Sequence, residues 1–156
     1  MQWTLVSGAY SELGPVKIGV PQGSLLGPRL FAIYDNDLPE FINNGEVYMY
    51  ADDTSIYAIG NTVDEISMGL QAILDQVQTW CLKNRFVVHE GKSEAMILSI
   101  SPFIGPMKPL RWGEEVIQYK SSSHCLGLLI DNKLSWSLHI ESLCRTFNAR
   151  VKVLKR

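Results

Sequence analysis

The clearest hydrophobic pattern in the chain lies in residues 63–82. Apolar side chains recur there every three or four positions and form one stripe, made by Val63, Ile66, Leu70, Ile73, Val77 and Trp80. Thr62 and Glu65 form a capping-box pattern at the front of this stripe. The pattern predicts a long amphipathic helix whose apolar side packs against a core, and it indicates no function by itself.

Shorter stretches rich in β-branched and aromatic residues predict strands. Residues 47–50 and 54–57 flank Asp52 and Asp53 and predict a hairpin within 47–59. A second hairpin is predicted over residues 110–119, with its turn at 112–115. Further strands are expected at residues 3–6, 16–20, 86–88, 95–100 and 125–130.

Two more helices complete the predicted elements. Residues 25–38 have helical spacing, but Pro28 is tolerated only near a helix start, so this helix begins late or is irregular. A final amphipathic helix is predicted from about Trp136 to the end of the chain. Hairpins and helices are mixed without regular βαβ units, which predicts an α+β fold with an antiparallel sheet backed by helices.

Charge is unevenly distributed along the chain. The net charge is −2, yet residues 145–156 contain five basic residues and no acidic one. These basic side chains fit contact with phosphates, but they equally fit the negative C-terminal end of a helix. The three cysteines are far apart, which argues against a zinc site or a disulfide framework. No apolar run is long enough to span a membrane, and we expect an intracellular protein of the nucleus or the cytoplasm.

Asp52 and Asp53 are the sharpest chemical feature. Adjacent carboxylates repel each other, and a divalent cation with hard oxygen ligands, such as Mg²⁺, would remove that conflict. Adjacent strand residues point to opposite faces, so both carboxylates serve one site only if the pair lies in a turn. Aspartate is also common in turns for local reasons, and the dipeptide alone favours this simpler explanation.

A loop rich in glycine and proline lies upstream of this pair. Residues 19–31 (GVPQGSLLGPRLF) combine a strand end, a broken loop and a helix start. Backbone amides exposed at a helix start can bind phosphate or sugar groups. An ordinary strand-to-helix turn explains the same residues on physical grounds alone.

The chain resembles the reverse transcriptases of non-LTR, LINE-type retrotransposons. The resemblance is carried by segments in order: residues 19–31, Ile33 to Pro39, Tyr50-Ala51-Asp52-Asp53-Thr54-Ser55, the region from Trp80 to Ser93, and residues 126–140. The Leu38-Pro39 pair and the Trp136, His139 and Ile140 pattern argue against a group II intron or telomerase relative. The match covers nearly the whole chain.

This resemblance implies an RNA-directed DNA polymerase that extends a DNA primer on an RNA template with deoxynucleotides, using two metal ions. Residues 1–135 would form part of the palm, and residues 136–156 would begin the thumb helix. Mg²⁺ or Mn²⁺ would be the cofactor, with Asp52 and Asp53 as its ligands. Tyr50 and Ala51 would lie at the primer end, and Gln22 and Gly23 would approach the template or the incoming nucleotide.

The resemblance also implies roles for more distant residues. Lys92 matches the family lysine proposed to protonate the leaving pyrophosphate, although a solvated turn lysine is an equally good explanation. Leu126 and Gly127 would contact the primer backbone, although burial in a strand explains Leu126 as well. The basic residues Arg145, Arg150 and Lys152 would contact a nucleic-acid backbone.

One departure from the family sets the expected activity. Family members carry another catalytic carboxylate on a strand well upstream of the Gly23 loop, and residues 1–17 provide no such strand. With the fingers and this strand missing, metal binding should be weak and the chain alone should not polymerise. The alternative hypothesis is a decayed or co-opted palm remnant that binds nucleic acid at most. Asp35, where an apolar residue is usual, is a smaller departure.

Overall fold

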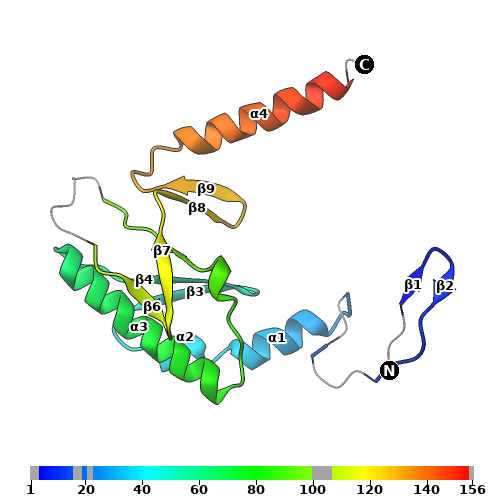
Figure 1. Ribbon diagram of the computed structural model, residues 1–156, viewed down its shortest axis with the longest axis horizontal. Helices are drawn as coiled ribbons and strands as arrows, with labels where there is room; N and C mark the ends of the chain where they lie inside the picture. Colours follow the sequence, from blue (N-terminus) through cyan, green and yellow to red (C-terminus); the bar gives the residue numbers. More distant parts are fainter. Residues whose placement is uncertain (1–3, 16–18, 21–22, 100–106, 155–156) are drawn as a thin grey trace.

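The computed structural model describes residues 4–15, 19–20, 23–99 and 107–154. Two short strands, two helices and a hairpin make up the first part: β1 (Leu5–Val6), β2 (Ala9–Tyr10), α1 (Gly27–Asp35), α2 (Leu38–Phe41), β3 (Glu46–Tyr50) and β4 (Asp53–Tyr57). The second part contains α3 (Val63–Lys83), the 3-10 turn η1 (Glu90–Lys92), β5 (Glu94–Ala95), β6 (Leu110–Trp112), β7 (Glu115–Tyr119), β8 (Ser122–Cys125), β9 (Leu128–Asp131) and α4 (Ser137–Leu154). Figure 1 shows their arrangement.

The predicted α+β class is confirmed, but the described strands are divided over four small sheets instead of one. Three sheets are the antiparallel pairs β1–β2, β3–β4 and β8–β9, and the fourth has the strand order β5-β7-β6. Within it β5 pairs with β7 in parallel, and β6 pairs with β7 as an antiparallel hairpin. Sheets of two or three strands are marginal alone, so each needs support from a helix.

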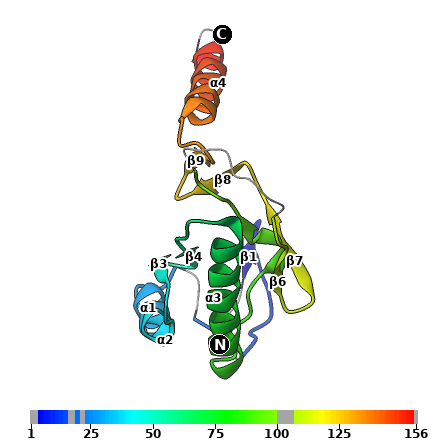
Figure 2. The ribbon, with the colours of Figure 1, turned by 90° about the vertical axis from the view of Figure 1, so that its left-hand side faces the viewer.

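Helix α3 supplies that support. It stands between the β3–β4 hairpin and the β6–β7 hairpin (Figure 2). One side buries Ile73, Val77 and Trp80 in a core shared with α2 and β3–β4. The neighbouring Leu74 belongs to a second core with Leu110 and its sheet partners. The predicted stripe is therefore confirmed, and α3 contributes to both cores, which Ile56 and Trp112 also join.

The predicted cap of α3 is also present. Thr62 Oγ1 accepts a hydrogen bond from the Glu65 amide at 3.1 Å. The Glu65 carboxylate reaches one residue further back than in a standard capping box and accepts from the Asn61 amide at 2.9 Å. Both bonds satisfy amide groups at the front of the helix, and they fix where the chain leaves the β3–β4 hairpin.

Two glutamine side chains of α3 each form a pair of hydrogen bonds with the backbone of one residue in a neighbouring segment. Each side chain accepts from the amide and donates to the carbonyl of that residue, as a paired strand residue does. Gln71 accepts from the Arg111 amide at 2.8 Å and donates to the Arg111 carbonyl at 2.9 Å, which ties α3 to β6. Gln76 accepts from the Asn43 amide at 2.8 Å and donates to the Asn43 carbonyl at 3.2 Å. Asn43 lies between α2 and β3, so the second pair holds the entry to the β3–β4 hairpin.

Four of the predicted strands are wrong or incomplete. Residues 86–88 are not a strand. Of the expected strand 95–100, Ala95 belongs to β5, residues 96–99 are not strand, and residue 100 lies outside the described part. The expected strand 125–130 is a hairpin whose turn is Leu126 and Gly127, with φ angles of 48° and 82°. Leu126 is 57% exposed, so burial in a strand does not explain it. Of the expected strand 16–20, residues 16–18 lie outside the described part, and 19–20 are not strand.

The predicted helices are confirmed with adjusted ends. Helix α1 begins at Gly27, with Pro28 in its first turn, as expected from the limits that proline places on helices. Helix α4 begins at Ser137 and carries no buried residue. Its predicted apolar face is open: Ile140, Leu143 and Phe147 are 56%, 55% and 67% exposed. Within the described residues no helix is both long and apolar enough to cross a membrane.

A buried carboxylate joins β9 to α4. Asp131 is 7% exposed and accepts hydrogen bonds from the amides of Lys133, Ser135 and Trp136 and from the Ser135 hydroxyl. These bonds, led by the one from the Ser135 amide, lower the pKa of Asp131 although burial opposes the shift. The charged form is therefore the one that the fold stabilises.

We predict that Gln76→Glu destabilises the protein by about 1–3 kcal/mol, because the carboxylate cannot donate to the Asn43 carbonyl. Urea unfolding followed by circular dichroism measures this change. The control for an amide-to-carboxylate change is Asn148→Asp on α4, an exposed position, which should change the unfolding free energy by less than about 0.5 kcal/mol. Equal stabilities of the two variants would contradict the structural role of Gln76.

We predict that stability falls as the solution is acidified through the pKa of Asp131. Because the folded-state pKa is lowered, the contribution of this group is complete above the unfolded pKa and is lost as pH falls toward the folded value. Thermal melts of the wild type and Asp131→Asn between pH 7 and acid pH measure the difference. The gap between the two melting temperatures should narrow on acidification, and a gap independent of pH would contradict this account.

Candidate metal and nucleic-acid site

The β3–β4 hairpin places Asp52 and Asp53 at its tip. Tyr50 pairs with Asp53 across the hairpin, so Ala51 and Asp52 form a two-residue turn and Asp53 is the first residue of β4. Ala51 has a φ of 53°, a left-handed conformation that non-glycine residues rarely adopt. The prediction that the carboxylate pair lies at a turn is therefore confirmed for Asp52, with Asp53 directly beside it.

The base of this hairpin is packed, whereas its tip is open. Val47, Met49 and Ile56 contact the core around α3, while Asp52 and Asp53 are exposed. On the outer face the Tyr48 hydroxyl donates to the Glu46 carboxylate at 3.0 Å, and this hydrogen bond raises the pKa of Tyr48. The packed base holds the position of the tip, and the tip leaves both carboxylates free to bind a ligand.

The loop before α1 approaches the same region. Gly23 has a φ of 80°, and the Gly27 amide donates a hydrogen bond to Ser24 Oγ at 2.9 Å. A Cβ atom added at Gly23 would meet nothing within 4 Å, so the space beside this backbone is open. The geometry suits a close approach of a ligand to the backbone at Gly23.

A cavity of about 900 Å³ lies between this loop, α1 and β3. Its lining comes from two stretches of the chain, residues 20–39 and residues 47–52: Val20, Gly23, Ser24, Gly27, Pro28, Phe31, Ala32, Asp35, Asn36, Pro39, Val47, Tyr48, Met49, Ala51 and Asp52. Three predicted site residues thus meet at one cavity, namely Gly23, Ala51 and Asp52. Tyr50 and Asp53 do not line it, and Gln22 is outside the described residues.

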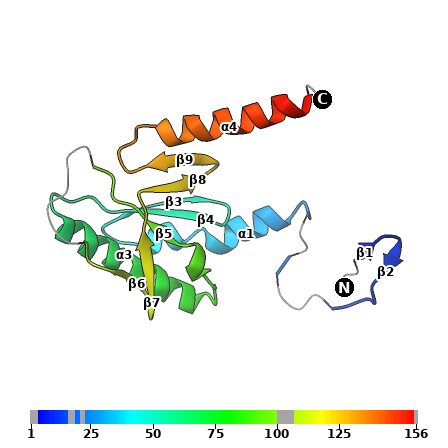
Figure 3. The same cartoon turned by 45° about the horizontal axis from the view of Figure 1, so that its top comes forward.

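The remaining predicted residues lie elsewhere in the fold. Lys92 is exposed at the end of η1, where its amide donates to the His89 carbonyl at 3.0 Å. Leu126 and Gly127 form the exposed tip of β8–β9, and Arg145, Arg150 and Lys152 are exposed on α4 (Figure 3). The Arg145 guanidinium contacts the Glu141 carboxylate at 3.4 Å, which offsets part of its charge. None of these residues lines the cavity.

Twelve of the lining residues were not predicted as site residues, and Ser24 and Asp35 are two polar ones among them. Ser24 Oγ accepts from the Gly27 amide at the start of α1, and Asp35 ends that helix with only 6% of its surface exposed. A buried carboxylate at the negative end of a helix is costly without a partner. In the sequence, Asp35 was notable only because the family usually has an apolar residue at this position. The folded chain shows that Asp35 lines the cavity.

The donor atoms at the hairpin suit part of a divalent-metal site. Among the described residues, no group of three or more histidine, cysteine, aspartate or glutamate side chains is arranged to hold an ion. Mg²⁺ is commonly bound by one or two carboxylates, with water and substrate phosphates completing the octahedron. Asp52 and Asp53 therefore fit as a partial ligand set of this kind.

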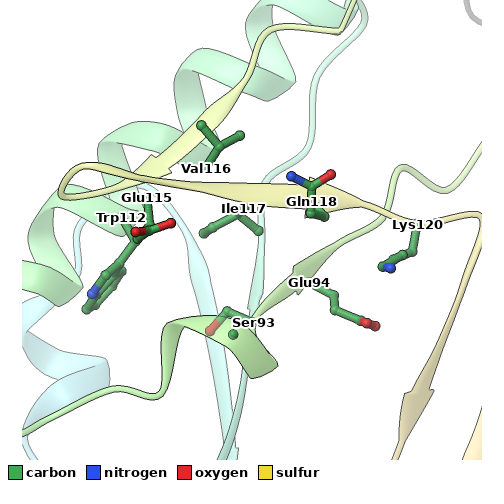
Figure 4. A pocket seen from close by; sticks show the side chains of 9 residues that line it. Ser93, Glu94, Trp112, Glu115, Val116, Ile117, Gln118 and Lys120 are labelled. Atoms are coloured by element: carbon green, nitrogen blue, oxygen red, sulfur yellow. The ribbon is translucent and has the colours of Figure 1, made fainter.

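A second, smaller cavity of about 220 Å³ lies beside β5 and β7 (Figure 4). Ser93, Glu94, Gln118 and Lys120 supply polar groups to its lining. The Glu94 carboxylate already accepts from the Ser123 hydroxyl at 2.8 Å, which ties β5 to β8. No predicted site residue lines this cavity, so the candidate site stays with the hairpin and the Gly23 loop.

Comparisons with known proteins identify the family of the chain. The family described as "Reverse transcriptase (RNA-dependent DNA polymerase)" matches residues 5–130. The RNA-directed DNA polymerase from mobile element jockey of Drosophila melanogaster is 28% identical over 153 residues, covering 94% of this chain and 16% of the relative. The probable RNA-directed DNA polymerase from transposon BS of the same species is 26% identical over 157 residues, covering 96% and 17%.

A further relative comes from a wasp. The retrovirus-related Pol polyprotein from type-1 retrotransposable element R1 2 of Nasonia vitripennis is 28% identical over 145 residues, covering 88% of this chain and 35% of the relative. The chain thus spans only about a sixth of the jockey polymerase. No solved structure matches it. The family match over most of the chain, with mobile-element polymerases as relatives, confirms the predicted resemblance: the chain belongs to the reverse transcriptase family, of the non-LTR retrotransposon type.

Proposed function

We propose that this chain forms the palm region of an RNA-directed DNA polymerase, with its metal site at the tip of the β3–β4 hairpin. One observation carries the proposal: Gly23, Ala51 and Asp52, which belong to two separate family motifs, line one cavity. The complete polymerase would act on an RNA template, a DNA primer and deoxynucleotides. Polymerase activity is proposed for the complete protein and not for this chain alone, because the chain covers only 16% of the jockey relative.

Asp52 and Asp53 are the proposed ligands of Mg²⁺ or Mn²⁺. When bound, the ion would supply charge neutralisation and Lewis-acid activation for in-line transfer of a nucleotide to the primer 3′ oxygen. The chain's own contribution is to hold two carboxylates side by side on a hairpin with a packed base. Their mutual repulsion makes the pair attractive to a cation.

The neighbouring residues have proposed positioning roles. Tyr50 and Ala51 flank Asp52 and would lie at the primer end. Gly23 would bring open backbone to the template or the incoming nucleotide, and the absence of any contact for a Cβ at Gly23 supports this role. Gln22, which lies outside the described residues, has the same proposed partners. The left-handed φ of Ala51 supports a functional turn, because strained residues cluster at such sites.

Two exposed regions are proposed to contact the nucleic acid outside the cavity. The turn Leu126–Gly127 would lie against the primer backbone, and Arg145, Arg150 and Lys152 of α4 would contact phosphates. The last acidic residue of α4, Glu141, lies more than two helical turns before Arg150 and Lys152. These two basic side chains therefore have no acidic neighbour in sequence that would offset their charge. The proposed role of Lys92 as the proton donor to pyrophosphate rests on the family resemblance alone, because its exposure on η1 fits a solvated turn lysine equally well.

We predict that Asp52→Asn and Asp53→Asn each weaken Mn²⁺ binding by about tenfold, or about 1.4 kcal/mol, because each removes one anionic ligand. Electron paramagnetic resonance of free Mn²⁺ measures the affinity directly. Asp75→Asn, which removes an exposed carboxylate from α3, is the charge-matched control and should leave the affinity unchanged. If all three variants bind Mn²⁺ like the wild type, the hairpin is not the metal site.

We predict that the double change Arg150→Ala and Lys152→Ala weakens binding to an RNA–DNA duplex and reduces the salt slope by roughly one unit per lost phosphate contact. Fluorescence anisotropy at several salt concentrations measures both quantities. Lys120→Ala, an exposed basic position outside α4, is the control and should keep the wild-type slope. An unchanged slope in the double variant would rule out α4 as a phosphate-binding element.

The two measurements together separate a working palm from a remnant without catalytic function. A palm that has lost its metal site would still bind the duplex through α4, and this binding would not depend on Mn²⁺ or on Asp52. A metal-dependent increase in duplex affinity that Asp52→Asn abolishes supports the polymerase proposal.

A further inference from the structure

The six residues that join β9 to α4, Asp131 to Trp136, form an elbow organised by one side chain. The two oxygens of the Asp131 carboxylate accept from three backbone amides and one hydroxyl of this segment at 3.0–3.1 Å. The Asp131 carbonyl also accepts from the Leu134 amide at 2.9 Å. The backbone amides of Lys133, Ser135 and Trp136 are not paired in a helix or a strand, and a single buried carboxylate accepts their hydrogen bonds instead.

The backbone of the elbow is held in an unfavourable conformation. Leu134 and Trp136 have φ angles of 54° and 64°, in the left-handed region that residues with a Cβ avoid. Such residues persist only where the surroundings over-determine them. Here the determining group is Asp131, because it binds the amides on both sides of Leu134 and the amide of Trp136 itself.

The first turn of α4 is fastened to the same hairpin. The Leu129 amide of β9 donates to His139 Nδ1 at 3.2 Å, and the ring of His139 lies edge-on to that of Trp136 with centroids 6.4 Å apart. The elbow is fixed to the rest of the fold as well, because the Asn132 amide donates to the Ser121 carbonyl at 2.9 Å. All of these contacts lie at one end of the helix.

Beyond this first turn α4 projects away from the rest of the fold (Figures 1 and 2). None of its 18 residues is buried. At 1.5 Å per residue, Arg150 and Lys152 lie about 20 Å along the helix from the elbow, so a tilt of about 10° moves them by roughly 3–4 Å. A displacement of that size is enough to break a contact between a guanidinium or ammonium group and a phosphate.

We propose that Asp131 is a positioning residue that fixes the direction of α4, and thereby the place where Arg150 and Lys152 meet a nucleic-acid backbone. The second half of this statement rests on the proposed function of the chain, whereas the first half depends only on the elbow. The Leu126–Gly127 turn lies at the other end of the β8–β9 hairpin. By fixing α4 to this hairpin, Asp131 also fixes the position of the turn relative to α4.

Two native cysteines allow a direct test. Cys125 ends β8 and Cys144 lies exposed on α4, so spin labels on this pair report the direction of the helix relative to the hairpin. Cys81 is buried and is replaced by alanine in every variant. Pulsed electron paramagnetic resonance should give one narrow distance distribution for this protein. In Asp131→Asn the distribution should broaden by about twofold, because an amide nitrogen cannot accept from the amides of the elbow.

Two further variants decide between an effect on α4 and general loss of structure. Ser135→Ala removes one of the bonds to the carboxylate and should broaden the distribution less than Asp131→Asn does. Glu114→Gln, which removes an exposed charge from the β6–β7 turn, should leave it unchanged. Circular dichroism should report the same helix content in all variants. A distribution as narrow in Asp131→Asn as in the parent protein would overturn the proposal.

Binding to the RNA–DNA duplex tests the second half. Asp131→Asn should weaken binding by about as much as the double change of Arg150 and Lys152 to alanine, although it removes a negative charge that would otherwise oppose binding. If that double change weakens binding and Asp131→Asn does not, the positioning role is wrong. If the parent protein does not bind the duplex, the proposed function fails, while the spin-label distances still decide whether Asp131 directs α4.

Discussion

The fold depends on the burial of α3 against two cores at once. Ile73, Val77 and Trp80 support α2 and the β3–β4 hairpin, while Leu74 supports the sheet formed by β5, β6 and β7. None of these sheets has more than three strands, so none has enough core of its own to be stable. The backbone-like hydrogen bonds of Gln71 and Gln76 fix the distance of the sheets from the helix, in addition to the apolar contacts. The position of the candidate site is thus set by a helix that contributes no residue to it.

Several unfavourable interactions of the structure lie at the candidate site. Two adjacent carboxylates share the hairpin tip, Ala51 is in a left-handed conformation, and Asp35 is buried at the end of α1 against the same cavity. The packed base of the hairpin, where Val47, Met49 and Ile56 join the α3 core, stabilises the hairpin against these unfavourable interactions. The elbow at Asp131 follows the same principle, since a buried and satisfied carboxylate maintains two strained residues. In both places, strain is confined to a short turn next to a well-packed element.

The sequence was informative wherever a single local rule decided the structure. The spacing of apolar residues predicted α3. Because proline is tolerated only near a helix start, Pro28 predicted that α1 begins after the first residues of the segment 25–38, and the helix begins at Gly27. The strand at 125–130 was mistaken because alternation of apolar residues does not show where a chain reverses, and Gly127 was read as part of a strand instead of a turn. Residues 86–88 have strand-like side chains but no pairing partner in the described fold. Their conformation follows from tertiary contacts, since the ring of Phe86 packs against Trp80.

The candidate site was recognisable from the sequence only through the resemblance to a family. The Asp52–Asp53 pair alone favours the simpler explanation of turn chemistry, and the loop before α1 is explained on physical grounds as an ordinary turn. What the folded chain adds is that these segments share one cavity, and that Asp35 and Ser24 line it too. Neither fact follows from local patterns, because residues 20–39 and 47–52 meet only in the folded chain.

The most direct test of the shared site is paramagnetic broadening of amide signals by Mn²⁺ in the ¹⁵N-labelled chain. The account predicts that the amides of Asp52, Asp53, Ala51 and Gly23 broaden at the lowest Mn²⁺ concentrations, well before those of Asn148 and Arg150 on α4. Broadening confined to other carboxylates, such as Glu94 or Glu114, or broadening of Asp52 without Gly23, would contradict a metal site shared by the hairpin and the Gly23 loop.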